Sequence, residues 1–294
     1  MARKNIAYLY VALAILLFGT TPAVGKLMLT NLNNLQVLFF LSFIATLTLF
    51  IIILFQRKIS IIKKYNLNDF KTFAYMGFFG IFLYHICLFG ALMFAPAQEA
   101  FIVNYTWPIW VLFFAVILLK EHFNFKKILA ILLSFIGVCI VITQGNFFSL
   151  SVLNIKGDLF ALAGAIFYGL FSVLGKKQNY EKITSMFFYY GFAFIYILII
   201  ILLFYQIPQL GLFEFFGLIW LGVSNSLGFV FWFLALKKGE TAKISNLIFL
   251  TPFFALVYIY LLVGETILLS SLIGLILIII GIMIQYIKKK NLCS

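Results

Sequence analysis

The sequence predicts an all-α membrane protein of ten transmembrane helices, arranged as two inverted five-helix repeats with the N-terminus and the C-terminus cytoplasmic. Three observations lead to this fold class. Of the 294 residues, 65% are hydrophobic and 10% are charged, whereas about 25% are charged in soluble domains. Ten apolar segments are long enough to cross a bilayer, and the second half repeats rare residues of the first at a constant spacing.

The ten segments follow from the length that a crossing requires. A hydrocarbon core about 30 Å thick needs about 20 apolar residues in a helix, which satisfies its own backbone polar groups. The first segment continues past Gly25 without a cleavage pattern, so we expect a helix there and not a signal peptide. The expected spans are residues 6–29, 35–55, 72–94, 97–119, 126–144, 158–176, 184–205, 212–236, 242–262 and 267–287.

The basic residues orient these spans. The formal net charge is +13, which in a soluble protein would suggest nucleic acid as a partner. With ten spans and a cytoplasmic N-terminus, every basic residue except Lys26 and Lys156 falls on the inner side. This agrees with the positive-inside rule, so we expect contacts with membrane lipids and none with nucleic acid.

The repeat is carried by residue types that are scarce in this chain. Equivalent positions lie 144 residues apart: Pro108 and Pro252, Glu121 and Glu265, Gly137 and Gly281. We therefore predict a first repeat over residues 1–145, an outer linker over 146–156 and a second repeat over 157–294. Five helices are an odd number, so the second repeat enters the membrane inverted. Inverted repeats place a substrate site near the midplane between the halves.

Polar residues in the first three spans are few. Gly19, Thr20, Thr21, Pro22 and Gly25 in the first span indicate either close packing with a kink or the lining of a path.

The third span holds Tyr84 and His85 near its middle. A histidine at that depth usually faces the bundle interior. It either finds a partner in a neighbouring backbone or hydroxyl group, or serves the site by binding substrate or coupling protons.

The fourth span carries the richest cluster. Asn104 and Trp107 share a helix face, with Tyr105 beside them. These aromatic residues either belong to an interfacial belt or line a cavity. At 1.5 Å per residue they lie about 12 to 15 Å down the helix, which favours the cavity. Glu99, one turn inside, is either an interfacial charge or a carboxylate that couples protons or binds ammonium groups.

The later spans contribute fewer candidates for substrate binding. They are Tyr168 in the sixth span, Asn225 and Trp232 in the eighth, and Asn246 in the ninth. A mid-helix amide in lipid needs a partner, which makes Asn225 the strongest of this set. Gly137, Gly274 and Gly281 in the fifth and tenth spans indicate packing or dimerisation.

Known catalytic and nucleotide-binding motifs are absent from the sequence, and the two histidines stand on different elements. We therefore expect no enzyme activity, no cofactor and no metal site. The oligomeric state is left open.

The ten-helix inverted duplication and the Pro108 to Glu121 motif with its copy resemble the EamA-type drug/metabolite transporters. The stretch ALMFAPAQEAFIVNYTWPIW is similar to the branch of bacterial aromatic amino-acid exporters. This resemblance implies that Tyr84, Tyr105 and Trp107 line a central cavity. The chain departs from that branch in the sixth span, where Phe167 and Tyr168 stand in place of an expected tryptophan.

The expected function is export of a small-molecule substrate across the bacterial inner membrane by alternating access, with neutral or aromatic amino acids as the leading class. Aromatic walls with a few amide and hydroxyl groups suit an apolar side chain and a zwitterionic end. One alternative is efflux of lipophilic cations held by Glu99 or by cation-π contacts. Another is a lipid-handling or sensing protein without solute turnover.

Overall fold

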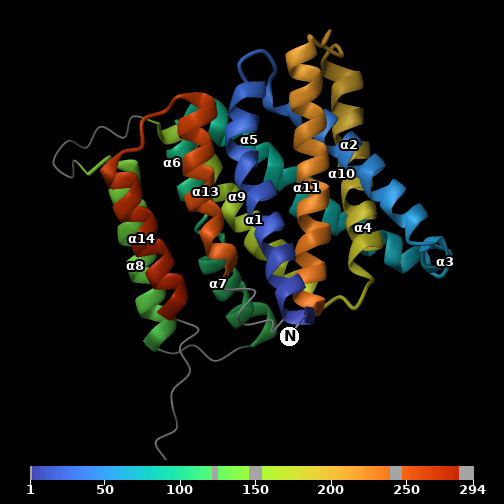
Figure 1. The fold of residues 1–294 in the computed structure, drawn as a ribbon, viewed down its shortest axis with the longest axis horizontal. Coiled ribbons are helices and arrows are strands. Elements are labelled where there is room, and N and C mark those ends of the chain that lie inside the picture. The colour runs from blue at the N-terminus through green and yellow to red at the C-terminus, as the bar shows by residue number, and fades with distance from the viewer. Residues whose placement is uncertain (1, 121–124, 146–153, 239–246, 285–294) are drawn as a thin grey trace, which may run out of the picture.

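A computed structural model describes residues 2–120, 125–145, 154–238 and 247–284 (Figure 1). Their regular elements are helices: α1 (Ala2–Met28), α2 (Asn34–Phe55), α3 (Ile59–Ile62), α4 (Leu67–Gly77), η1 (Phe78–Leu83), α5 (Tyr84–Phe94), α6 (Ala97–Asn104), α7 (Trp107–Leu119), α8 (Phe125–Ile142), α9 (Ile155–Lys176), α10 (Lys182–Phe204), α11 (Leu212–Lys238), η2 (Ile248–Leu250), α13 (Thr251–Tyr258), η3 (Ile259–Val263) and α14 (Leu269–Ile284).

The helices have the length and surface of a membrane protein. Within the part of the chain that the structure describes, seven helices are long and apolar enough to cross a bilayer, and three shorter apolar helices cover Leu132–Val141, Ile248–Val263 and Leu269–Ile284. Large apolar side chains point outward, with Phe135 65% exposed and Phe204 74% exposed. A monomeric soluble protein rarely exposes contiguous apolar surface of this kind. The prediction of an all-α membrane protein is therefore confirmed, while the count of ten crossings remains a prediction.

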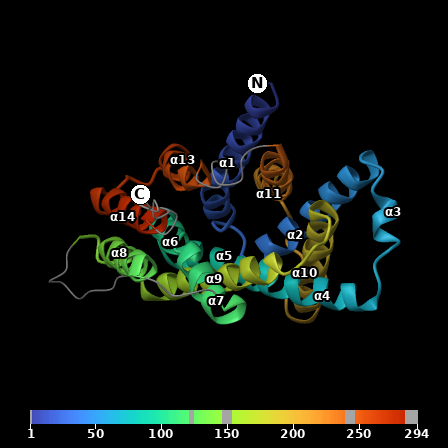
Figure 2. The ribbon, with the colours of Figure 1, turned by 90° about the horizontal axis from the view of Figure 1, so that it is seen from below.

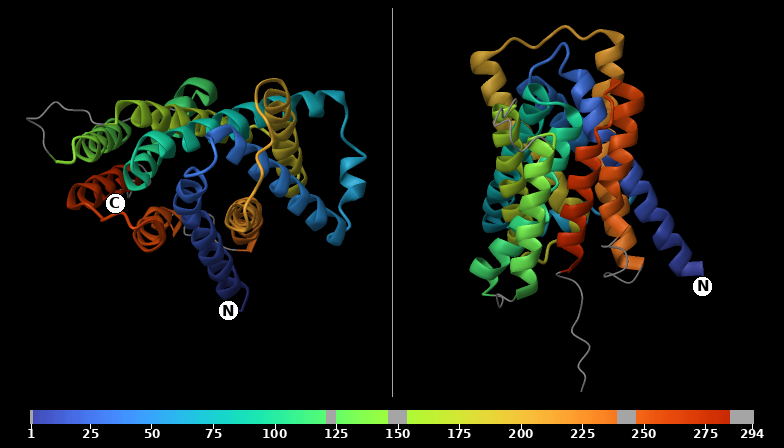
Figure 3. Two further views of the ribbon diagram at one scale, coloured as in Figure 1. Left: turned by 90° about the horizontal axis from the view of Figure 1, so that it is seen from above. Right: turned by 90° about the vertical axis from the view of Figure 1, so that its left-hand side faces the viewer.

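Helix pairs recur in the two halves. α1 packs against α11, and α9 packs against α5 and η1; α13 packs against α1, and α7 packs against α9. Two further pairs, α8 with α14 and α2 with α10, join equivalent helices (Figures 1 and 2). Each expected span of the first half has an equivalent in the second, five spans later. When every helix in these pairs is replaced by its equivalent, the result is again a pair that packs together in the structure. The described ends of α1 and α14 lie on the same face of the molecule (Figure 3).

Two helices differ from the straight spans that the sequence predicts. The third begins at Leu67, because Asn66 and Asp69 form a capping box with reciprocal hydrogen bonds. It then widens into a π-helical turn, η1, before α5. The fourth is interrupted at Tyr105 and Thr106, between α6 and α7. Pro108 explains this break, because proline has no N–H for the carbonyl four residues earlier.

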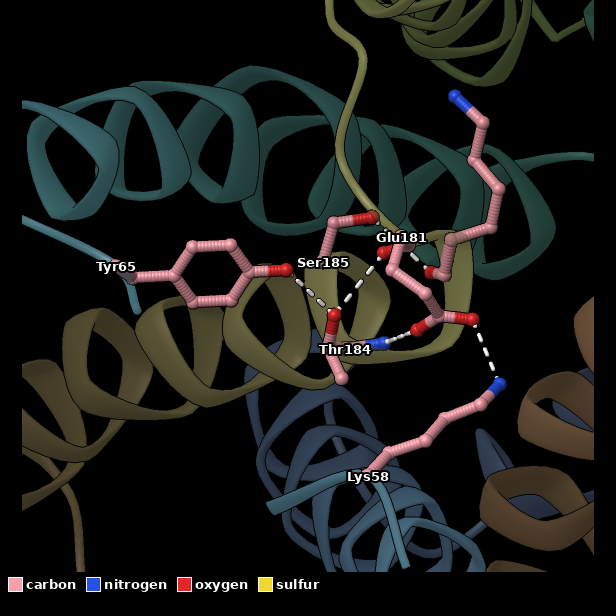
Figure 4. Close-up of polar contacts among 6 residues, drawn as sticks. Lys58, Tyr65, Glu181, Thr184 and Ser185 are labelled. Atoms are coloured by element: carbon pink, nitrogen blue, oxygen red, sulfur yellow. Dashed lines mark hydrogen bonds and ion pairs between the residues drawn. The ribbon is translucent and has the colours of Figure 1, made fainter. Parts of the chain in front are cut away.

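A polar cluster joins the α2–α4 connection to the start of α10. The Lys58 ammonium contacts the Glu181 carboxylate at 2.7 Å, and the other carboxylate oxygen accepts from the Thr184 N–H at 2.8 Å (Figure 4). The Tyr65 and Thr184 hydroxyls lie 2.6 Å apart. Burial acts to raise the pKa of Glu181, but Lys58 and the Thr184 amide outweigh it and hold the pKa below its ordinary value. This cluster ties the two halves together at one face.

Candidate functional site

A cavity of ≈ 140 Å³ lies where the two halves meet. Every residue that the sequence predicts to bind substrate lines it, except Asn246, which falls outside the described residues. The lining residues are Phe18, Thr21, Gly80, Ile81, Tyr84, His85, Leu88, Phe101, Asn104, Tyr105, Trp107, Tyr168, Asn225, Phe229, Trp232, Ile248 and Thr251. Side chains from both halves therefore converge on one space.

Aromatic rings form one wall of the cavity. The ring of Tyr168 lies 4.8 Å from that of Tyr84 and 5.0 Å from that of Trp107, centroid to centroid, with an interplanar angle of 82° to the tryptophan. Tyr105 and Trp107 lie 6.2 Å apart at 72°. These separations are favourable for aromatic pairs. Tyr168 of α9 therefore contacts one ring from α5 and one from α7.

Asn104 places an amide in this wall. Its Nδ2 donates to the Ala161 carbonyl oxygen at 3.1 Å, and its Oδ1 accepts a long bond from the Tyr84 hydroxyl at 3.4 Å. The amide can reach α9 because residue 164 is glycine: a Cβ there would stand 2.7 Å from Nδ2. Asn104 thus connects the cavity wall of the first half to the backbone of α9 in the second.

His85 and Asn225 supply polar groups on another side. His85 Nδ1 lies 2.8 Å from the Ile81 carbonyl oxygen, and because a carbonyl only accepts, Nδ1 carries the proton in this contact. The Asn225 side chain also reaches His85 and donates to the Thr21 hydroxyl at 3.3 Å and the Leu221 carbonyl oxygen at 2.9 Å. His85 thus has a backbone partner, which was one of the two alternatives, and it also lines the cavity.

Glu265 links the connection before α14 to the start of α6. Its two carboxylate oxygens accept from the N–H groups of Ala97 at 2.7 Å and Gln98 at 3.1 Å, at the start of α6. A carboxylate at a helix N-terminus meets unpaired N–H groups and the positive end of the helix dipole. Lys26 lies at the end of α1 and donates to the carbonyl oxygens of Leu92 and Ala95. The Lys26 bonds therefore join α1 to the end of α5, beside the Glu265 bonds at the start of α6.

Glu99 does not line the cavity. It is 3% exposed, its Oε2 accepts from Asn154 Nδ2 at 3.1 Å, and its carboxyl group contacts that of Asp158. Sequence reasoning missed Asp158, which stood at the predicted start of a span like an ordinary interfacial charge. It also missed Phe18, Phe101 and Phe229 as lining residues, because single phenylalanines carry no signal in a chain with 38 of them.

The size and lining of the cavity suit one aromatic ring with polar substituents. A cavity of about 150 Å³ in a protein core accepts benzene when its lining is apolar. Here the rings of Tyr84, Trp107 and Tyr168 offer faces and edges, while Asn104, His85 and Asn225 offer hydrogen-bonding groups. The cavity therefore offers apolar ring surface and hydrogen-bonding groups in one small space.

Comparison with known proteins places this geometry in context. The profile of the family described as the EamA-like transporter family matches residues 5–143 and again residues 155–287. An uncharacterized transporter of Clostridium kluyveri is 24% identical, over 97% of this chain and 94% of the relative. The uncharacterized transporter YyaM of Bacillus subtilis is 26% identical, over 82% and 80%.

Two further similarities are informative. The aromatic amino acid exporter YddG of Ancylobacter novellus is 28% identical, over 34% of this chain and 36% of the relative. A crystal structure that is 20% identical superimposes with a TM-score of 0.69 over 96% of both chains, which shows a shared fold.

Proposed function

The chain belongs to the EamA-like transporter family, and from this premise we propose that it is a secondary carrier that exports neutral or aromatic amino acids by alternating access. That it is a multi-pass membrane transporter follows from the family and from its apolar helices. The substrate class, the direction and the mechanism are the proposal.

One observation carries the substrate class: aromatic rings and buried amides converge in a cavity the size of a single ring. Tyr84, Trp107 and Tyr168 would hold the apolar side chain between faces and edges. Asn104, His85 and Asn225 would satisfy the ammonium and carboxylate ends. The partial similarity to an aromatic amino acid exporter supports the same class.

The mechanism rests on the relationship between the halves. We place ten crossings in a bacterial inner membrane, with both ends of the chain cytoplasmic and the second half inverted. The two separate family matches and the recurring helix contacts support this arrangement. Rocking of one half against the other would open the cavity first to one side and then to the other. Opening of the cavity on the side of Glu265 would break its bonds to α6.

Counterflow in liposomes tests the proposal directly. Purified protein is reconstituted with unlabelled phenylalanine inside, and uptake of labelled phenylalanine, tryptophan and threonine is measured with and without a pH gradient. Saturable uptake that an aromatic amino acid competes away is the expected result. No exchange of any of the three by intact protein would refute the amino-acid class, and lipophilic cations or lipids would then be tested in the same vesicles.

Variants assign the site within that assay. Tyr105→Ala and Trp107→Ala should each lower the initial exchange rate at least tenfold while the protein still reaches the membrane. The control is Phe135→Ala, which removes an aromatic side chain of similar size from the outward face of α8. Unchanged exchange in both cavity variants would remove the site assignment but leave the carrier function standing.

A further inference from the structure

Two acidic side chains meet in the interface between the halves, outside the cavity. Glu99 lies on α6 and Asp158 on α9, and each is 3% exposed. Their carboxyl groups lie within hydrogen-bonding reach of each other. One of them belongs to the first half and the other to the second.

Few hydrogen-bond donors lie near these two carboxyl groups. Asn154 Nδ2 donates to Glu99 Oε2 at 3.1 Å, and the Gln144 side chain approaches the same carboxyl group. Among the described residues, Glu99 Oε1 and both oxygens of Asp158 are buried without a hydrogen-bond partner. A buried carboxylate in that condition is costly, because it has lost water and gained no donor in return.

The neighbouring charged groups are engaged elsewhere. Lys26 of α1 is bound to the carbonyl oxygens of Leu92 and Ala95, and Glu265 is bound to the N–H groups of Ala97 and Gln98. Lys156, on the first turn of α9, is exposed. The other described titratable groups on helices packed against α6 are Tyr8, Tyr10, Tyr84, His85, Cys87, Cys139, Tyr168, Lys176 and Tyr258. Lys176, the cation among them, stands at the opposite end of α9 from Asp158. A counter-cation for the pair is therefore not supplied by any residue that the structure describes.

We propose that Glu99 and Asp158 form a proton-binding site in which one proton is shared between the two carboxyl groups. Two like charges in contact in a water-poor site cannot both persist, so one group holds a proton and donates it to the other. The shared proton gives a donor to oxygens that otherwise have none. Loss of that proton to the solvent leaves two carboxylates that repel each other across the interface.

The position of the pair links its protonation to the cavity. Asn104 lies five residues after Glu99 on α6, and its partner Ala161 lies three residues after Asp158 on α9. The carboxyl pair and the hydrogen bond from Asn104 to Ala161 therefore both join α6 to α9, at neighbouring positions along the two helices. Repulsion at Glu99 and Asp158 would separate α6 from α9 and disturb Asn104 and, through it, Tyr84. For its role in transport this inference rests on the proposed function, but the shared proton does not.

Infrared spectroscopy tests the proton without any substrate. The difference spectrum at pH 7 between the wild type and the double variant Glu99→Gln with Asp158→Asn should contain one protonated-carboxyl band, which fades as the pH is raised. If the double variant does not fold, Asp158→Asn alone gives the difference spectrum. Absence of the band at pH 7 would overturn the proposal. So would thermal stabilisation of the wild type, but not of the variant, by sodium compared with choline, because it would indicate a cation site.

Transport provides the second readout, in the liposome counterflow assay. Asp158→Asn should leave exchange of substrate within about twofold of the wild type and abolish the response to a pH gradient. The matched control is Asp69→Asn, which changes an acid on α4 outside this pair. A retained pH response in Asp158→Asn would overturn the coupling role. Absence of exchange in the wild type would instead count against the carrier function, while the infrared result would still decide the proton site.

Discussion

The Tyr105 hydroxyl donates to the Ile248 carbonyl oxygen at 2.8 Å, across the interface between the halves. In an α-helix that carbonyl would accept from residue 252, which is proline and has no N–H. The Ile248 carbonyl accepts instead from Thr251 N–H in a 3-10 turn and from the tyrosine. Pro252 of the second half thus leaves the Ile248 carbonyl oxygen able to accept from Tyr105. Tyr105 lies three residues before Pro108, the equivalent proline of the first half.

Tyr105→Phe should remove the hydrogen bond to the Ile248 carbonyl oxygen while keeping the aromatic ring in the cavity wall. The ring remains, but the carbonyl loses one donor in a dry environment, at a cost of about 1 kcal/mol. We expect a lower midpoint of thermal unfolding in detergent and slower counterflow. Tyr260→Phe is the control, since Tyr260 lies on η3 with 54% of its surface exposed. Equal behaviour of the two variants would show that the hydroxyl bond contributes nothing.

Gly137→Ala should destabilise the packing of α8 on α14. A Cβ on Gly137 would stand 2.6 Å from the carbonyl oxygen of Gly274, which is backbone and cannot move aside. Overpacking of this kind costs about 1–3 kcal/mol. The matched change is Gly175→Ala in α9, where the nearest atom is Met76 Cε at 3.5 Å. Thermal unfolding of both variants measures the difference, and a Gly137 variant as stable as the Gly175 variant would contradict the close approach.

Substitutions at Lys120 and Gly264 should shift the midpoint of thermal unfolding in opposite directions. Each of these residues ends a helix in the left-handed conformation, with φ of 54° and 80°, and they are 144 residues apart. Glycine adopts this conformation freely, whereas other residues pay about 1 kcal/mol. We expect Lys120→Gly to raise the unfolding midpoint and Gly264→Ala to lower it. A loss of stability in Lys120→Gly would show that the lysine side chain is needed there.

Glu181→Gln should lower stability by up to about 1 kcal/mol, because the Lys58 and Glu181 side chains are 25% and 27% exposed and solvent weakens their contact. The pKa of Glu181 is lowered in the folded protein. Its contribution is therefore present above the ordinary carboxyl pKa and is lost as the pH falls through the folded value. The wild type and the variant should converge in thermal stability at acidic pH. A difference that persists there would assign the effect to packing and not to charge.

Much of the fold was predictable because the membrane imposes strict rules on the sequence. A long apolar run must be helical in lipid. The orientation inferred from the basic residues and the repeat inferred from the scarce prolines stay predictions. The cavity residues were predictable for a related reason: an Asn or His in a lipid-facing position is too costly, so such residues point inward. Tyr84, His85, Asn104 and Asn225 all line the cavity.

Other features depend on contacts that no local pattern encodes. The π-helical turn before Tyr84 lies where Gly77 and Gly80 are packed closely against α10 and α9. Asp158 lies in the first turn of α9, and the packing of α9 on α6 buries it against Glu99.

Composition and the positions of polar residues were enough to predict the class of protein and the set of inward-facing polar residues, because both follow from the cost of polar groups in lipid. The repeated halves remain a prediction from scarce residues at a constant spacing. The tertiary structure alone decided which of the inward-facing polar residues share a cavity and which acids meet, because helix packing brings together positions that are far apart in the chain. Glu99 and Tyr105 lie on one short stretch, yet packing assigns the first to a carboxyl pair with Asp158 and the second to the cavity wall.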